Sequence, residues 1–166
     1  GAIAEIPIRN MLSFETGLLL STKGHREMVE DTFLGETIKL KASTRLYYLD
    51  IPINAKVSIP AGKLKFYGSI GPYFGFGIYG KTKTEFTFQG NTEKEDEDIS
   101  WGSDEEDDHL RRLDLGLTVT AGIELKFIQI GLSYNLGLAN ISSFREEGAT
   151  IKNKVIGISL AYRFVR

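Results

Sequence analysis

Hydrophobic residues alternate with small or polar residues near the end of the chain, over residues 155–164. One set comprises Ile156, Ile158, Leu160, Tyr162 and Phe164, and the other comprises Val155, Gly157, Ser159, Ala161 and Arg163. A period of two places successive side chains on opposite faces of a β-strand. The two faces differ enough to predict two unlike surroundings, lipid on one side and a polar interior on the other.

The same alternation recurs along most of the chain and predicts seven strands. They cover residues 2–8, 12–22, 45–59, 64–88, 112–127, 128–138 and 155–164. Most of them reach the roughly 9 to 11 residues that a tilted strand needs to cross a bilayer. Leu19 and Leu46 fall in the polar set, and residues 38–42 alternate in the other phase. We therefore expect a bulge or a separate extension before Arg45.

The connections between these strands alternate in length. Short links are expected at residues 9–10, 60–62 and 126–129, and long polar links at residues 23–36, 89–110 and 140–154. Outer-membrane barrels have short turns on the periplasmic side and long loops on the outer side. The alternation of link lengths therefore favours a barrel that spans the outer membrane.

The number of strands is a further prediction. If the long loops are external, the first and last predicted strands both run inward, whereas single-chain bacterial barrels have an even number of strands. We expect an all-β, antiparallel up-and-down transmembrane barrel of eight strands, formed as one domain by residues 1–166. Its first strand and a signal peptide are expected to precede Gly1. Two alternatives stay open: residues 36–42 supply the extra strand, or the barrel is incomplete.

Composition narrows the class of protein further. The chain has 166 residues, 42% of them hydrophobic, and no cysteine, so disulfides and thiolate metal sites are excluded. An uncharged run at residues 66–80 contains glycines and a proline and is shorter than the roughly 20 residues of a spanning helix. A net charge of −2 gives no argument for a nucleic-acid partner.

Several segments resemble a known family. YYLDIPINAKV, GSIGPYFGFGIYGK, LDLGLTVTAGIEL, SYNLGLANIS and KNKVIGISLAYRF are similar to the PorT-like outer-membrane β-barrel family of Bacteroidetes, which are Gram-negative, and LSFETGLLLSTKG extends the match. The resemblance implies an eight-stranded barrel in the cell outer membrane, usually with a Gly-rich opening strand that this sequence lacks. It brings no catalytic residues, and one member of the family takes part in protein export.

The polar set predicts a charged interior. It places five acids beside five bases: Glu5, Glu15, Asp50, Asp114 and Glu124 with Lys56, Lys65, Arg112, Lys126 and Arg163. Charges removed from water need partners, and an eight-stranded barrel is just wide enough to be filled by side chains. We expect a hydrogen-bonded plug that includes Tyr67, Tyr73 and Tyr79, without an open pore; an ion or proton path is the alternative.

The link at residues 89–110 is strongly acidic, with TEKEDEDISWGSDEEDD at its centre. Like-charge repulsion predicts an extended, solvated loop. Divalent cations are the second candidate, because oxygen ligands are plentiful although the spacing is not that of an EF-hand. A basic partner is the third. Trp101 is expected to anchor either a partner or the loop itself.

No pattern indicates catalysis, so we expect no enzyme, no cofactor and no resident metal site. His25 and His109 lie in or beside long links without a nucleophile motif. Gly71, Gly75 and Gly77 lie within a strand and form no phosphate-binding loop. The predicted function is a structural, anchoring or surface-interaction protein, or part of an export assembly, whose partners are the lipid bilayer and other envelope proteins.

A soluble lipocalin-like barrel that binds a small apolar ligand is the alternative, because inverting the two faces preserves every alternation. Two observations oppose it. A glycine-rich polar face would make a poor water-exposed surface, and aromatic residues lie near strand ends as in membrane girdles. These are Phe66, Phe127, Tyr134, Tyr162 and Phe164.

Overall fold

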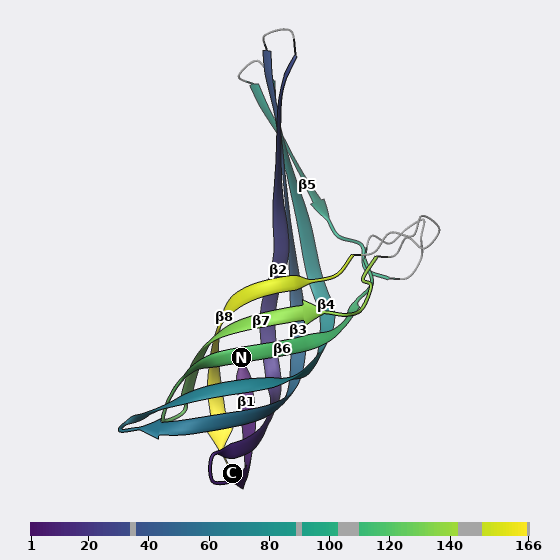
Figure 1. The fold of residues 1–166 in the computed structure, drawn as a ribbon. Helices are drawn as coiled ribbons and strands as arrows, with labels where there is room; N and C mark the ends of the chain where they lie inside the picture. The colour runs from purple at the N-terminus through teal and green to yellow at the C-terminus, as the bar shows by residue number, and fades with distance from the viewer. Residues whose placement is uncertain (34–35, 89–90, 103–109, 143–150, 166) are drawn as a thin grey trace.

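The computed structural model describes residues 1–33, 36–88, 91–102, 110–142 and 151–165. The chain is all-β and places eight strands in one sheet (Figure 1). The strands are β1 (Ala2–Arg9), β2 (Leu12–Phe33), β3 (Glu36–Ala61), β4 (Leu64–Phe88), β5 (Asn91–Asp98), β6 (Leu113–Leu125), β7 (Ile128–Gly137) and β8 (Lys154–Val165). The described part of the chain contains no helix long and apolar enough to span a membrane.

Within the described residues, seven of these strands close into a barrel. Their order is β3-β2-β1-β8-β7-β6-β4, and β4 pairs with β3 to complete the wall. Neighbours are antiparallel except β1 and β8, which pair in parallel from Ala2 opposite Tyr162 to Glu5 opposite Val165. A closed up-and-down wall with an odd number of strands must contain one such parallel pair. The seven wall strands are the seven that alternation predicts, and an upstream eighth strand stays a prediction.

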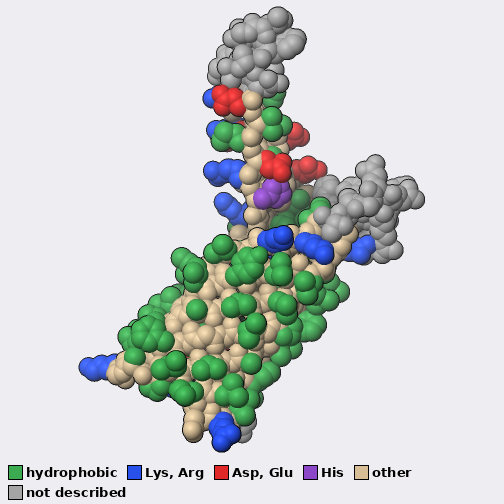
Figure 2. All heavy atoms as spheres, viewed as in Figure 1, with side chains coloured by type: hydrophobic (Ala, Val, Ile, Leu, Met, Phe, Trp, Pro, Cys, Tyr) green, Lys and Arg blue, Asp and Glu red, His purple; other side chains and the backbone are tan. Residues whose placement is uncertain are grey.

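Burial alternates along the wall strands as the sequence pattern predicts. The apolar set faces outward, with Ile158 85% and Ile156 74% exposed, while Lys56 and Asp114 on the inner face are fully buried. Hydrophobic side chains are spread over the face of the barrel that Figure 2 shows, where few charged side chains are seen. This is the arrangement of a barrel in lipid and the inverse of a soluble barrel.

Tight turns join the strands at the end of the barrel where β1 meets β2, β3 meets β4 and β6 meets β7. Each turn contains one residue with a left-handed backbone: Asn10 at φ 30°, Gly62 at φ 66° and Lys126 at φ 49°. Glycine adopts this conformation freely, and asparagine tolerates it better than most residues. The three short links expected from the sequence are confirmed.

At the opposite end, three wall strands continue far beyond the barrel (Figure 1). Residues 24–33 of β2, 36–45 of β3 and 80–88 of β4 form, with β5, a four-stranded antiparallel sheet. We call this the outer sheet. It corrects two predictions, because much of the expected link at 23–36 is strand, and residues 91–98 of the acidic link form β5 instead of an extended loop.

A bulge is present in the strand next to β3, not before Arg45. The pairing of β3 with β4 shifts between Tyr47, opposite Tyr79, and Tyr48, opposite Gly77, so Ile78 is an extra residue in β4. An extra residue reverses the facing of every side chain beyond it. This bulge does not explain the change of phase at residues 38–42, because β3 pairs with β2 without a shift on either side of Arg45. Those residues lie in the part of β3 that continues into the outer sheet, so the separate extension expected before Arg45 is confirmed.

Candidate functional site

A cluster of ionised side chains fills the barrel near the tight turns, centred on Lys56 of β3. Its Nζ atom lies 2.9 Å from Glu5 and 3.0 Å from Glu15, and it also pairs with Glu124. It donates a hydrogen bond of 2.8 Å to the side-chain oxygen of Gln129. These partners come from β1, β2, β6 and β7, so one ammonium group connects five strands of the wall.

Arg163 of β8 completes this cluster. Its guanidinium donates to Glu5 at 2.8 Å and to the Lys126 carbonyl at 2.8 Å, and it lies 3.3 Å from Glu124. Lys56 also lies 4.9 Å from the ring centroid of Tyr67, a favourable cation–π distance. Two bases thus hold three buried carboxylates, and we call this group the Lys56 cluster.

A second group lies toward the outer sheet, around Lys23. Its Nζ atom pairs with Asp50 at 3.2 Å and with Asp114 at 2.9 Å. The ring centroids of Tyr48 and Tyr73 lie 4.3 and 4.5 Å from the same atom. Asp114 also accepts from the Tyr73 hydroxyl at 3.0 Å and from Asn153 at 2.8 Å. We call this group the Lys23 cluster.

The prediction of five acids and five bases in the interior is wrong for three of the bases. All five acids are buried, but among the predicted bases only Lys56 and Arg163 are. Lys65, Arg112 and Lys126 are exposed. They lie at strand ends, where long cationic side chains extend their charged groups into water.

Lys23 is the interior base that sequence reasoning missed. It is only 1% exposed, yet β2 was expected to end at Thr22. Its phase carried a signal, because Ser21 and Lys23 continue the inward set of Ser13 and Glu15.

The three predicted inward tyrosines are also partly corrected. Tyr67 and Tyr73 are buried, but Tyr79 is 46% exposed, because the bulge at Ile78 turns it outward. Its hydroxyl donates to Asp98 at 3.0 Å. Tyr48, which was not among the three predicted tyrosines, points into the barrel instead and is fully buried.

A small hydrophobic core lies at the end of the barrel next to the outer sheet. It comprises Leu46, Tyr48, Leu110 and Ile141, with Ile99 and Trp101 packed against it. The Trp101 ring meets the Tyr48 ring edge-on, with centroids 5.5 Å apart. Within the described residues Trp101 therefore anchors its own segment, one of its two predicted roles. The inward phase of Leu46, an exception in the sequence pattern, is explained by this core.

Gly75 and Gly77 make room for these groups. A Cβ atom at Gly75 would lie 2.6 Å from Asp50 Oδ1, and one at Gly77 would overlap the Trp101 ring. These glycines therefore provide interior space, as expected of glycines within a strand.

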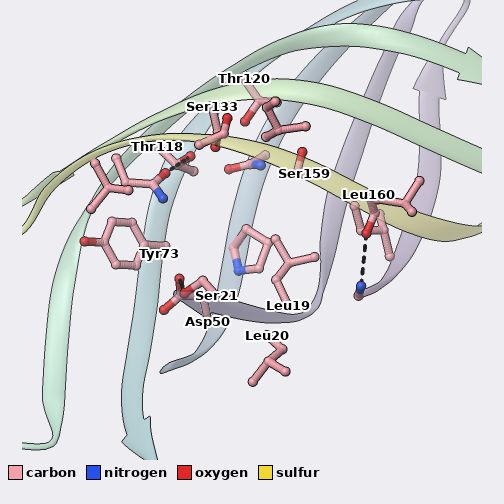
Figure 3. Close-up of a pocket in the computed structure, with 18 of the residues that line it drawn as sticks. Leu19, Leu20, Ser21, Asp50, Tyr73, Thr118, Thr120, Ser133, Ser159 and Leu160 are labelled. Atoms are coloured by element: carbon pink, nitrogen blue, oxygen red, sulfur yellow. Dashed lines mark hydrogen bonds between the residues drawn. The ribbon is translucent and has the colours of Figure 1, made fainter. Parts of the chain in front are cut away.

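A cavity of about 350 Å³ interrupts the wall between β2 and β8, on the side of the first residue of β1 that faces the outer sheet (Figure 3). The pairing of β1 with β2 ends at Leu18 and that with β8 ends at Tyr162, while both neighbours continue further. Figure 3 shows Asp50 and Tyr73 on one side of this cavity and Leu160 on the other. The Gly1 amino group donates to the Leu160 carbonyl at 3.0 Å.

Of the two histidines, only His25 lies within the described residues. His25 lies on the outer sheet, 3.8 Å from Glu27, with 63% of its side chain exposed. His109 lies outside the described residues. No group of three or more His, Cys, Asp or Glu side chains within the described ranges is placed to hold a metal ion.

The chain was compared with protein families, curated proteins and solved structures. The family model described as an outer membrane protein beta-barrel domain matches residues 1–143. No curated protein matches the chain. No solved structure matches it either.

Proposed function

The chain belongs to the outer membrane protein beta-barrel domain family, and we propose that it is a closed membrane anchor that presents the outer sheet at the cell surface. Family membership implies an outer-membrane location for the small barrel. The apolar outer face of the wall supports the bilayer as its partner. The proposal assigns no catalytic role to the chain.

One observation carries the anchoring role: charged side chains that bond to one another occupy the cross-section of the barrel at two levels. The Lys56 cluster joins six strands, β1, β2, β3, β6, β7 and β8. The Lys23 cluster and the core around Tyr48 and Trp101 lie between it and the outer sheet. An ion moving along the axis would have to separate several buried ion pairs, which costs several kcal/mol for each.

Conductance of the purified protein in planar bilayers tests this role. We expect no current steps above the bare-membrane level for the wild type or for Lys65→Gln, which changes an exposed base. Reproducible cation-selective steps that change in Asp50→Asn would overturn the anchor and support an ion path.

We also propose that the chain belongs to the PorT-like branch of outer-membrane barrels and acts with other envelope proteins. The support is the resemblance of the segments, in the family's order, over about residues 45–164. Co-purification from detergent-solubilised envelope tests whether the chain acts with other envelope proteins. Recovery of the barrel alone after mild cross-linking would contradict it.

A further inference from the structure

The outer sheet has two chemically different faces. Directly opposed residues of antiparallel strands lie on the same face, so the strand pairings assign each side chain. One face carries His25, Glu27, Val29, Leu40, Ala42, Thr44, Thr82, Thr84, Phe86, Phe88, Asn91, Glu93, Glu95 and Glu97. The other carries Arg26, Met28, Glu30, Lys39, Lys41, Ser43, Arg45, Lys81, Lys83, Glu85, Thr87, Thr92, Lys94, Asp96 and Asp98. We call them the acidic face and the basic face.

A row of apolar side chains crosses the acidic face. Val29 of β2 lies opposite Leu40 of β3, which lies opposite Phe86 of β4. They are 59%, 40% and 41% exposed, and Phe88, two residues along the same face, is 39% exposed. A shallow pocket beside this row is lined by Thr84, Phe86, Glu93, Glu95 and Lys94 of the sheet edge. The sheet is a single layer here, so this apolar area is available to a partner.

Charge is distributed differently on the two faces. Among the described side chains, the acidic face has four glutamates and no lysine or arginine. The basic face contains its own ion pairs: Lys39 with Glu30 at 3.0 Å, Lys81 and Lys83 with Asp96 at 3.0 and 3.3 Å, and Lys94 with Glu85 at 3.1 Å. Figure 2 shows most Lys and Arg along one side of the outer sheet, opposite His and several acidic side chains.

These observations favour one kind of occupant. We infer that the acidic face is a docking surface for a basic polypeptide segment whose apolar residues cover the row from Val29 to Phe86 and whose lysines or arginines meet Glu27, Glu93 and Glu95. This inference rests on the proposed role of the outer sheet as the part presented at the surface.

Other occupants fit the surface less well. Two acidic faces in a symmetric dimer would bring like charges together, and an acidic face against a basic face would form an open chain of copies and compete with existing ion pairs. Anionic lipid headgroups would be repelled by the glutamates. The described residues contain no group of three acidic or histidine ligands for a metal ion.

Peptide binding to the whole protein in nanodiscs of zwitterionic lipid tests the inference. The probe is a fluorescent ten-residue peptide of alternating lysine and leucine, with the glutamate–leucine peptide as its acidic counterpart and empty discs as the baseline. We expect Leu40→Ser/Phe86→Ser and Glu93→Gln/Glu95→Gln each to weaken binding of the basic peptide by roughly tenfold. The controls Met28→Ser and Glu85→Gln change the basic face and should alter binding less than about twofold.

The outcomes separate the inference from the anchoring role. Equal losses on both faces, or unchanged binding in both acidic-face variants, overturn the inference. A dimer in sedimentation that the acidic-face variants abolish would also overturn it, in favour of a second copy. Because the Glu93→Gln/Glu95→Gln pair preserves side-chain shape, a loss there is not explained by a misfolded sheet. Bilayer conductance reports on the anchor independently of peptide binding.

Discussion

Replacing Lys56 by methionine should destabilise the barrel more than any replacement of an exposed lysine. The substitution keeps the length and apolar stem of the side chain but removes the ammonium group that pairs with Glu5, Glu15 and Glu124. Lys56 is fully buried, so water cannot replace it. Arg163 would then remain as the partner base of Glu5 and Glu124, while Glu15 would lose the base with which it pairs.

The size of the effect follows from this uncompensated charge. Removing one partner of a buried ion pair typically costs about 3 to 5 kcal/mol, because the remaining charge stays buried. Lys65→Met is the matched control, since Lys65 was expected in the interior but is exposed. Exposed substitutions of this kind usually change stability by less than about 0.5 kcal/mol.

Urea unfolding in detergent micelles measures the difference. Trp101 is the single tryptophan of the chain and packs in the core at the mouth of the barrel, so its fluorescence reports loss of that core. Band shifts between heated and unheated gel lanes give a second readout of the folded wall. Equal unfolding midpoints for Lys56→Met and Lys65→Met would refute the reasoning that the Lys56 cluster stabilises the interior.

Two further predictions concern the small core around Trp101, at the end of the barrel next to the outer sheet, and the outer sheet itself. Gly77→Val should displace Trp101, since even a Cβ atom there overlaps its ring; a red-shifted emission maximum is expected, and an unchanged spectrum would contradict the packing. The Lys94 ammonium beside Glu85 lowers the pKa of that carboxyl from its usual value. The pair therefore stabilises the β4–β5 hairpin above the usual pKa, and this contribution is lost as pH falls through the lowered pKa. Amide hydrogen exchange of β5 should show a smaller acid-induced loss of protection in Lys94→Gln, and identical profiles would count against the pair.

The wall of the barrel could be predicted because its signal is local. Lipid on one side and a filled interior on the other force a period of two, which is readable in β8 without knowledge of its neighbours. Turn chemistry around Gly62 and Asn10 is local as well. The predicted bounds of β4 agree with the structure at both ends.

The outer sheet and the full interior could not be predicted in the same way. Both faces of the outer sheet meet water, so no contrast between lipid and interior marks β5 or the outer parts of β2 and β3. The outer part of β4 is the exception, because it lies within the strand predicted at residues 64–88. Whether a lysine with inward phase is buried depends on its position along the barrel axis, since one near the end of the wall can reach water. Lys23 and Lys65 differ in that respect, not in residue type. A single extra residue, Ile78, decided the facing of Tyr79.

The unbroken passage of β2, β3 and β4 from the tight turns into the outer sheet has a mechanical consequence. β3 has 26 residues, a contour of about 85 Å at the usual strand rise. Its neighbours β2 and β4 also pass from the wall into the outer sheet as single strands. A force applied to the end of the outer sheet farthest from the barrel would therefore be transmitted into the wall. It would act along continuous backbone and along the hydrogen bonds that pair β2, β3 and β4.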